Sequence, residues 1–343
     1  MRVALLVRES ANRVYADASA RLLVAELRAM ASTMFVGVVD PHVDTIGGVD
    51  YVVFATSDGE TSSVRLDDRD RRTLSDLSTV RAIFLLDDGP VLQRVLHPVL
   101  IEPTEYFDDD LVTIQRYPGK TNEQFTHLLV NVAIAAAPAA RRRRDAGERV
   151  RLLDPVAGRG STLNRALLAG FDATGIEVVE ADTDQYRTFL AQYLRDRRIK
   201  HTTEREKIRK GPLAGTSSVT LTIRREQRMH LVCGDTRSSR DLLRGRRFEL
   251  VVGDLPYGVH HRSTGAAAAR RSPEDLVAES IDGWADLLVS GGAVSLSWNT
   301  RTMPRAVVEE AVEGAGLSTV DHPVSFEHVV DRSITRDLLV ATK

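Results

Sequence analysis

From residue 150 to the end of the chain, short apolar runs alternate with segments whose apolar residues recur at helical spacing. This pattern predicts strands at residues 150–153, 173–177, 229–233, 248–252, 293–298, 325–330 and 336–341. It predicts helices at residues 161–169, 181–195, 238–243, 273–289 and 304–315. Alternation of this kind favours a parallel sheet covered on both faces, and the last two strands are joined by a short turn. We therefore expect an α/β fold with a mostly parallel seven-stranded sheet and an antiparallel C-terminal hairpin.

The first part of the chain carries a smaller set of alternating elements. Strands are predicted at residues 3–7, 34–39, 51–55 and 82–86, and helices at residues 18–31 and 69–77. We therefore expect a small N-terminal α/β domain at residues 1–114. It shows no glycine-rich phosphate loop, no metal-ligand spacing and no Ser/His/Asp arrangement, so docking or substrate presentation is its expected role. Residues 115–343 would form the larger domain.

The larger domain begins with a turn-rich segment, in which Thr121 or Asn122 would cap a helix at residues 123–137. Pro138 is expected to end that helix, and the arginines at residues 141–144 to link it to the next strand. Residues 197–228 interrupt the alternation, because they are first basic, then rich in Gly, Pro and Ser, and then strand-like. We expect this stretch to be a basic insertion that projects from the sheet.

Basic residues cluster at two places, although the formal net charge of the chain is −2. One cluster is the arginine run at residues 141–144. The other comprises Arg195, Arg197, Arg198, Lys200, Arg205, Lys207, Arg209 and Lys210. Such clusters can neutralise nucleic-acid phosphates; the alternative is a solvated linker and a solvated helix face.

The composition excludes several classes of protein. Apolar residues make up 43% and charged residues 27%, which is typical of a globular protein with a substantial core. The longest apolar stretch, residues 128–137, is too short to span a bilayer, and the N-terminus lacks the features of a signal peptide. The single cysteine, Cys233, excludes an internal disulfide, and no Cys/His cluster suggests a metal. We expect a cytoplasmic protein that neither enters a membrane nor binds a metal.

The strongest local signal lies where the predicted strand at residues 150–153 ends and a helix begins. It reads Asp154-Pro155-Val156-Ala157-Gly158-Arg159-Gly160. Gly158 and Gly160 allow a tight turn and a close approach to a ligand, at the edge where open α/β sheets bind their ligands. The loop lacks the lysine and the third glycine of phosphate-binding loops. An acid beside glycines suits a cation, namely the ammonium and sulfonium of S-adenosylmethionine; the alternative is a turn whose glycines serve packing alone.

Two further acids end the next two predicted strands. Glu177 lies about 20 residues beyond the glycine loop, where an acid can accept hydrogen bonds from ribose hydroxyls. Asp235, in the sequence Gly234-Asp235-Thr236, is placed to accept from an adenine amino group. One acid at a strand end is commonplace, but three on successive strands indicate a shared ligand.

The strand at residues 248–252 is followed by Asp254-Leu255-Pro256-Tyr257-Gly258. A planar amino group is conjugated and therefore a poor nucleophile. Hydrogen bonds from it to the Asp254 carboxylate and the Leu255 carbonyl would return electron density to its nitrogen during methylation. Pro256 would fix the carbonyl direction, and Tyr257, expected as an exposed aromatic, would offer a face for a flipped base. The alternative is an ordinary strand-ending turn.

Together these motifs resemble the class I S-adenosylmethionine-dependent amino-methyltransferases, and within them the tRNA guanosine N2-methyltransferases associated with THUMP domains. The similar parts are Pro118-Gly119, residues 154–160, Gly175 to Glu177, Asp254 to Gly258 and the turn at residues 331–336. The resemblance covers residues 115–343. It implies a Rossmann-like methyltransferase domain, S-adenosylmethionine as cofactor, and an RNA substrate, with guanine N2 in tRNA as the target.

The resemblance also implies roles for individual residues. Asp254, Leu255, Pro256 and Tyr257 would be catalytic. The cofactor would be bound by Lys120, Thr121, Asp154, Pro155, Ala157, Gly158, Gly160, Glu177, Gly234, Asp235, Thr236 and Asp254, with Lys120 and Thr121 near its methionine end. Leu255 and Ala157 depart from the commonest family pattern, and the N-terminal domain shows no THUMP pattern.

Other functions share some of these features. A DNA adenine-N6 or cytosine-N4 methyltransferase would use the same tetrad, but no target-recognition domain is evident beyond the insertion. A protein glutamine methyltransferase would favour Asn at the position of Asp254. A non-catalytic cofactor-binding partner is disfavoured by the complete set of motif residues, and a Rossmann dehydrogenase by the missing third glycine.

Overall fold

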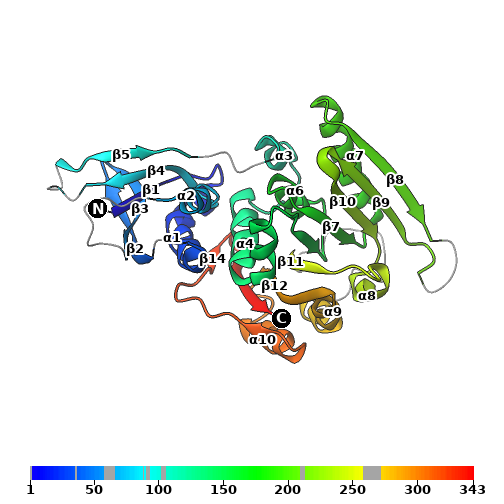
Figure 1. Ribbon diagram of the computed structural model, residues 1–343. Helices are drawn as coiled ribbons and strands as arrows, with labels where there is room; N and C mark the ends of the chain where they lie inside the picture. The colour runs from blue at the N-terminus through cyan, green and yellow to red at the C-terminus, as the bar shows by residue number, and fades with distance from the viewer. Residues whose placement is uncertain are drawn as a thin grey trace. The chain divides into compact units, whose positions relative to one another are not determined.

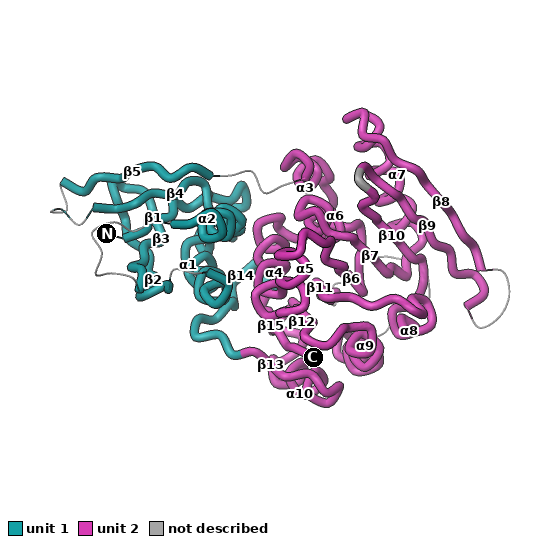
Figure 2. The backbone as a smooth tube through the Cα atoms, in the orientation of Figure 1, with its two compact units in different colours: residues 1–104, 321–335 teal, residues 105–320, 336–343 magenta. Residues whose placement is uncertain are grey.

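The computed structural model describes residues 2–34, 37–57, 66–87, 89, 93–101, 106–208, 213–257 and 272–343. The chain divides into two compact units (Figure 2). Unit 1 comprises residues 1–104 and 321–335, and unit 2 comprises residues 105–320 and 336–343. None of the helices in the described ranges has the length and apolar character needed to cross a membrane.

Unit 1 is an antiparallel sheet packed against a long helix. Its strands are β1 (Arg2–Val7), β2 (Val38–Ile46), β3 (Val49–Thr56), β4 (Val80–Leu86) and β5 (Leu96–Val99), in the order β2-β3-β1-β4-β5. The helices are α1 (Arg13–Met30), η1 (Ala31–Thr33) and α2 (Asp68–Ser75), and β14 (His328–Val329) also belongs to this unit. Ala4, Tyr51, Val53 and Leu86 form an apolar cluster. The expected α/β character is present, with β5 as a strand that the sequence did not predict.

Unit 2 contains the larger sheet (Figure 1). Its strands are β6 (Arg151–Asp154), β7 (Asp172–Glu177), β8 (His201–Lys207), β9 (Ser217–Ile223), β10 (Gln227–Cys233), β11 (Phe248–Asp254), β12 (Leu288–Asn299), β13 (Ser318–Thr319) and β15 (Thr335–Thr342). Its helices are α3 (Asp110–Thr113), α4 (Glu123–Ala136), α5 (Pro138–Asp145), α6 (Ser161–Leu168), α7 (Glu180–Asp196), η3 (Arg224–Glu226), η4 (Thr236–Ser238), α8 (Ser239–Leu242), α9 (Pro273–Leu287) and α10 (Arg305–Gly314).

The strands of unit 2 follow the order β13-β15-β12-β11-β6-β7-β10-β9-β8. The central five, from β12 to β10, are parallel, as expected for a sheet built from alternating strands and helices. The remaining pairings are antiparallel, so the sheet is mixed. The expected seven-stranded, mostly parallel sheet is therefore not confirmed, because the insertion adds the hairpin β8–β9 to one edge.

The C-terminal part of the expected sheet also differs from its prediction. Only His328 and Val329 of the strand expected at residues 325–330 are extended. β15 instead lies between β12 and β13 and runs antiparallel to both. A pairing of this kind joins strands that are distant in sequence, which a local hydrophobic pattern does not report.

The arginine run at residues 141–144 lies in a helix, whereas a linker was expected. Pro138 does end α4, but it occupies the first turn of α5, where its missing N–H costs no hydrogen bond. Arg143 then bonds to the carbonyl of Arg149 at 2.8 Å and pairs with Glu148 at 3.0 Å. Part of the run is thus used within the fold.

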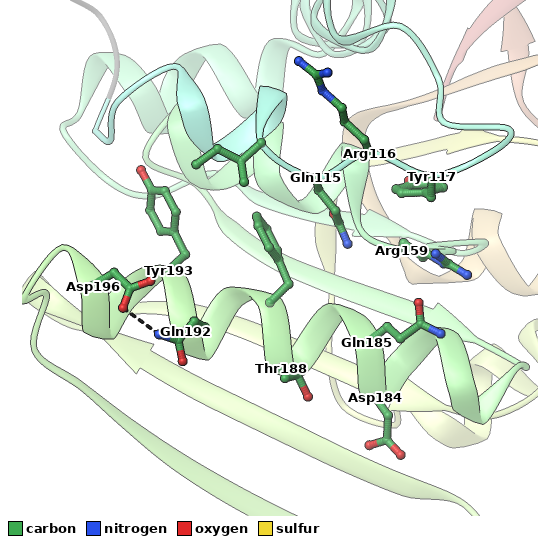
Figure 3. A pocket seen from close by; sticks show the side chains of 12 residues that line it. Gln115, Arg116, Tyr117, Arg159, Asp184, Gln185, Thr188, Gln192, Tyr193 and Asp196 are labelled. Atoms are coloured by element: carbon green, nitrogen blue, oxygen red, sulfur yellow. Dashed lines mark hydrogen bonds between the residues drawn. The ribbon is translucent and has the colours of Figure 1, made fainter.

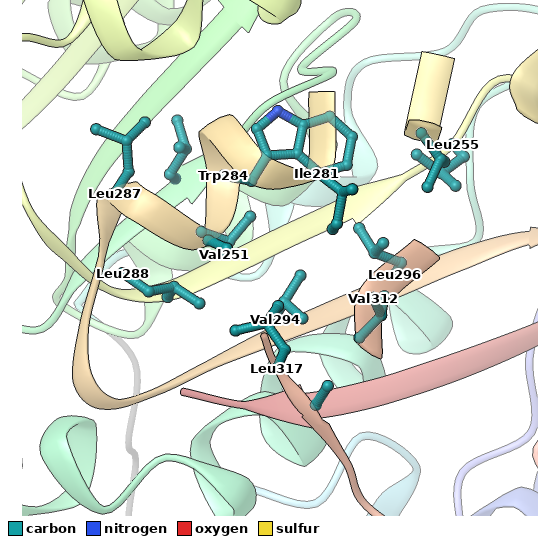
Figure 4. Packing of buried hydrophobic residues seen from close by; sticks show 14 of the residues in the cluster. Val251, Leu255, Ile281, Trp284, Leu287, Leu288, Val294, Leu296, Val312 and Leu317 are labelled. Atoms are coloured by element: carbon teal, nitrogen blue, oxygen red, sulfur yellow. The ribbon is translucent and has the colours of Figure 1, made fainter. Parts of the chain in front are cut away.

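Unit 2 has apolar packing on both faces of its sheet. One cluster joins Val251, Val294 and Leu296 of the strands to Ile281 and Trp284 of α9 (Figure 4). The neighbouring strand residues Leu250 and Val252 are also buried, and successive strand residues point to opposite faces. The indole N–H groups in this core are satisfied, since Trp284 donates to the Thr236 hydroxyl at 2.9 Å and Trp298 to the Met303 carbonyl at 2.8 Å.

Gly160→Ala is expected to lower the free energy of unfolding by about 3 kcal/mol, from a left-handed backbone and an overpacked contact. Gly160 has φ +81°, and an added Cβ would lie 2.3 Å from the ring of Tyr186. Urea unfolding measures the change. Gly147→Ala is the matched control, because Gly147 has φ +69° with nothing within 4 Å of the added Cβ; it should cost about 1 kcal/mol. Equal losses in the two variants would contradict the Tyr186 contact.

Candidate active site at the carboxyl ends of the parallel strands

Three predicted acids end three neighbouring strands of the parallel block. Asp154 ends β6, Glu177 ends β7 and Asp254 ends β11. β6 pairs with β7 on one side and with β11 on the other. Carboxyl ends of parallel strands meet at one edge of a sheet, and this edge is where open α/β sheets bind ligands. The structure therefore brings these three carboxylates to one edge.

The glycine loop after β6 is held by the two acids nearest to it. The N–H of Val156 donates to Asp154 Oδ1 at 3.0 Å, and the N–H of Gly158 donates to Glu177 Oε2 at 2.8 Å. The other Glu177 oxygen accepts from the N–H of Val179 at 2.8 Å. Glu177 thus connects the loop after β6 to the start of α7.

Pro155 and Ala157 lie on the protein side of the same loop. Both are buried, and the N–H of Ala157 donates to the carbonyl of Ile176 at 2.9 Å. Pro155 lies against Gly253, where an added Cβ would meet Pro155 Cδ at 3.5 Å. These two residues fasten the loop to β7 and β11.

Asp154 is fully enclosed. Burial raises its pKa from 3.8 to about 7, although hydrogen bonds from the Val156 N–H and the Thr162 hydroxyl oppose the shift. The negative charges of Asp254 and Glu177 raise the pKa further. Asp154 therefore fixes the backbone conformation of the loop. It affects ligand binding through that conformation and not by direct contact.

The glycine loop fits a ligand with cationic groups and a ribose. Gly158 has φ +50°, and nothing lies within 4 Å of a Cβ added there, so its open side admits close approach. The strands that end at this edge carry Asp154, Glu177 and Asp254, and acids of this kind suit an ammonium and a sulfonium better than a phosphate. Among the described residues no group of three or more His, Cys, Asp or Glu is arranged to hold a metal ion.

The segment after β10 is placed beside Glu177, but its side chains serve the fold. The N–H of Gly234 donates to the carbonyl of Glu177 at 2.9 Å. Asp235 pairs with Arg237, whose guanidinium lowers the pKa of Asp235 and also pairs with Glu279 at 2.9 Å. Thr236 is buried and accepts from the Trp284 indole. The Asp235 carboxylate, expected to accept from an adenine amino group, is thus engaged by the Arg237 backbone and guanidinium.

The Asp254 carboxylate is the most heavily bonded group of the site. Tyr257 and Ser297 donate their hydroxyl hydrogens to Oδ1, and Thr121 donates to Oδ2. Arg336 lies 3.9 Å from Oδ2. Thr121, expected to bind the cofactor, thus contacts Asp254, which the sequence predicts to be catalytic.

Tyr257 differs from the exposed aromatic that was expected. It is half-buried, and the Arg336 guanidinium lies 5.0 Å from its ring centroid. Burial, followed by the charge of Asp254, raises the pKa of Tyr257, whereas Arg336 lowers it. The Phe125 ring lies 4.7 Å from the same guanidinium, which is only 3% exposed. Arg336 thus packs against the Tyr257 ring, which is why the ring is less exposed than the sequence predicted.

The backbone of the tetrad is held by β12. The N–H of Leu255 donates to the carbonyl of Ser297 at 2.8 Å, and the Leu255 side chain is buried. Nothing in the described part of the chain, which ends at residue 257 here and resumes at residue 272, donates to the Leu255 carbonyl. Pro256 is exposed, and Gly258 lies outside the described residues.

The segment before α4 contributes one residue that the sequence did not single out. The hydroxyl groups of Tyr117 and Ser161 lie 3.0 Å apart, and Arg159 lies over the Tyr117 ring at 4.9 Å. Burial raises the pKa of Tyr117, and Asp254 and Asp154 are near enough to contribute. Lys120, by contrast, donates to the Val112 carbonyl, and burial lowers its pKa. Lys120 therefore braces α3, and the structure places Tyr117 at the site.

Asp154→Asn is expected to flatten the pH dependence of stability between about pH 4 and about pH 7. The pKa of Asp154 is raised to about 7 in the folded chain, so the folded state binds the extra proton in this window and stability falls as pH rises. The slope from one such group is about 1.4 kcal/mol per pH unit. Urea unfolding of both proteins across this range gives the difference. Parallel curves would show that Asp154 ionises normally.

Arg336→Met is expected to lower the free energy of unfolding by about 3 kcal/mol, because a partly buried carboxylate loses its cation. A double-mutant cycle with Asp254→Asn isolates the interaction from the lost contacts to Phe125 and Tyr257. We expect the double variant to be more stable than the sum of the single losses by about 1 kcal/mol or more. Strict additivity would mean that Arg336 serves packing alone.

Comparison with known proteins finds neither a family nor a curated protein that matches this chain. Among solved structures, TrmN from Thermus thermophilus is 14% identical, with a TM-score of 0.41 over 90% of this chain and 60% of TrmN. The rRNA methyltransferase aviRa from Streptomyces viridochromogenes is 14% identical, with a TM-score of 0.39 over 70% of this chain and 95% of that one. An rRNA methylase from Streptococcus thermophilus is 14% identical, with a TM-score of 0.34 over 57% of this chain and 87% of that one. The chain thus spans less than two thirds of the length of TrmN.

Proposed function

We propose that this chain is an S-adenosylmethionine-dependent methyltransferase that acts on an exocyclic amino group of a base in RNA, with guanine N2 in tRNA as the target. The observation that carries the proposal is the position of Asp254 and Leu255. Two acceptors, a carboxylate and a backbone carbonyl, end β11 directly beside the glycine loop that ends β6. An amino group has two hydrogens, and these two acceptors match them.

The bonding around Asp254 leaves room for such a substrate. A carboxylate offers about four acceptor sites, two on each oxygen. In the described part of the chain, Tyr257 and Ser297 fill those of Oδ1, whereas Oδ2 accepts one hydrogen bond, from Thr121, and lies 3.9 Å from the Arg336 guanidinium. One site on Oδ2 therefore remains for a substrate N–H.

Bound S-adenosylmethionine supplies a methyl group on a positively charged sulfur. The residues of the chain prepare the nitrogen that receives it. When Asp254 and the Leu255 carbonyl accept hydrogen bonds from the two N–H groups, the lone pair of the nitrogen becomes less conjugated with the base. Methylation would leave the nitrogen with one proton too many, and the Asp254 carboxylate or water would accept it. The three hydroxyls on Asp254 fix the carboxylate before the substrate arrives.

The cofactor assignment is supported by the loop after β6. Gly158 leaves its outer side open, and Glu177 fixes the loop backbone. Three backbone N–H groups, those of Gly158, Val178 and Val179, bond to the Glu177 carboxylate, and its remaining acceptor capacity suits a ribose hydroxyl. The preference for RNA and for guanine N2 rests on the sequence resemblance of residues 115–343 and on the basic segments.

Asp254→Ala is expected to reduce methyl transfer at least 100-fold while leaving cofactor binding within a fewfold of the wild type, because Asp254 acts on the substrate amino group. Purified protein is incubated with tritiated S-adenosylmethionine and, separately, with unmodified tRNA transcripts, total RNA and genomic DNA. Digested products are then analysed for methylated nucleosides. Calorimetry with the cofactor provides the second readout.

The matched control is Asp241→Asn, since Asp241 is an exposed carboxylate on α8 that pairs with Arg244. It should retain full activity. N2-methylguanosine in RNA alone, absent with Asp254→Ala, supports the proposal in full. Methylated adenine or cytosine in DNA would replace RNA by DNA as the substrate. Cofactor binding without label in any nucleic acid would contradict the enzymatic assignment.

A further inference from the structure

Helix α7 separates two pockets of unit 2 that have different chemistry. One pocket lies between α7 and the segment at residues 114–117, and the other lies between α7 and the insertion strand β8. Thr188 lines both pockets. The two pockets therefore adjoin each other at Thr188 of α7, and the insertion forms one wall of the second pocket.

The first pocket has the chemistry of a nucleobase site. Its volume is about 640 Å³, and Figure 3 shows Tyr117 and Arg159 across the pocket from α7, whereas the Arg116 side chain points away from the helix. Phe189 lines it with a half-buried ring, and Gln115, Gln185 and Gln192 add amide groups. Aromatic faces stack on any base, and arginines and amides hydrogen-bond to base edges or phosphates.

This pocket adjoins the glycine loop of the candidate active site through two of its lining residues. Arg159 belongs to that loop and lies over the Tyr117 ring at 4.9 Å, and the Tyr117 hydroxyl lies 3.0 Å from that of Ser161, which follows the loop. A nucleotide in the pocket would thus neighbour a base held at Asp254. Two acids also line the pocket, but Asp184 pairs with Arg187 at 3.0 Å and Asp196 accepts from Gln192 at 2.6 Å.

The second pocket has the chemistry of a phosphate site. Its volume is about 180 Å³, and its lining includes Arg195, Arg205 and His201 and no acidic residue. Arg187 also lines it, but its charge is compensated by Asp184 at 3.0 Å. The arrangement follows from the pleat of β8. His201, Thr203 and Arg205 alternate along the strand and line the pocket, so Glu204 and Glu206 point to the opposite face. His201 and Arg205 of β8 therefore face α7, whereas Glu204 and Glu206 face away from it.

We propose that these two pockets together bind a single-stranded segment of the RNA substrate, with a base stacked in the first pocket and backbone phosphates in the second. The inference rests on the proposed function and adds the path of the strand next to the methylated base. It gives the insertion a role, because β8 contributes His201 and Arg205 to the phosphate pocket. Single-stranded RNA suits these two adjoining pockets, because bases stacked within a duplex have no free face for an aromatic side chain.

The test measures binding of a fluorescein-labelled single-stranded RNA of about 12 nucleotides by anisotropy between 50 and 200 mM salt. The Arg195→Ala/Arg205→Ala double variant should bind about tenfold more weakly at 50 mM salt. It should also lower the slope of log affinity against log salt by about 1.4, because each phosphate contact on a single strand contributes about 0.7. Phe189→Ala should weaken binding about tenfold with an unchanged slope, since stacking releases no counterions.

Arg244→Ala is the matched control, because Arg244 is an exposed arginine of unit 2 that lines neither pocket. Its binding should equal that of the wild type. All variants should keep the wild-type melting temperature and cofactor affinity. In methyl-transfer assays the pocket variants should raise KM for RNA and leave kcat within about twofold, because none of these side chains touches the reacting atoms.

The outcomes separate this inference from the proposed function. Tight RNA binding that is insensitive to the pocket variants, or that falls equally with Arg244→Ala, overturns the inference and leaves methyl transfer standing. Tighter binding of duplex RNA than of the single strand also overturns it. Loss of activity in Asp254→Ala with unchanged RNA affinity supports both the proposed function and this inference, because the two RNA-binding pockets and residues 254–257 then act as independent sites.

Discussion

The carboxylate of Asp254 joins segments that lie far apart in the sequence, and the arrangement of the site depends on it. Thr121 contacts it from the loop before α4, Ser297 from β12 and Arg336 from β15. A half-buried carboxylate has to be satisfied by donors, or its desolvation destabilises the fold. The same donors that solve this problem also fix the direction of the oxygen that remains available to a substrate.

The register of the sheet explains why these donors meet. Asp254 pairs with Ser297 across β11 and β12, and Asn299 pairs with Arg336 across β12 and β15. Antiparallel β15 therefore returns a cation to the edge where the parallel strands end. Arg336 then lies between Phe125 and Tyr257, so one guanidinium positions both the aromatic ring and the carboxylate of the tetrad. The C-terminal strand belongs to the site as much as the glycine loop does.

The sequence predicted those parts whose signal is local. Asp154, Glu177 and Asp254 follow apolar runs directly, and their strand-end positions emerge from that pattern alone. Ser297 and Arg336 were missed because their role depends on strand pairing across more than 40 and 80 residues. β8 was missed because it is an edge strand with exposed polar residues on both faces, which leaves no hydrophobic alternation. The exposed Tyr257 was predicted wrongly for the same reason as Arg336 was missed: the residue that covers it comes from β15.

Helix α7 sets the distance between the glycine loop and the insertion. Near its start, Glu177 holds the loop through Gly158, and the ring of Tyr186 fills the space that a side chain at residue 160 would need. Near its end, Arg195 faces β8 across the second pocket. A helix of this length is rigid, so an RNA segment bound at the insertion as proposed would reach the site at a fixed spacing. Insertions in the loop after α7 are therefore expected to change which nucleotide is presented, whereas the chemistry at Asp254 stays the same.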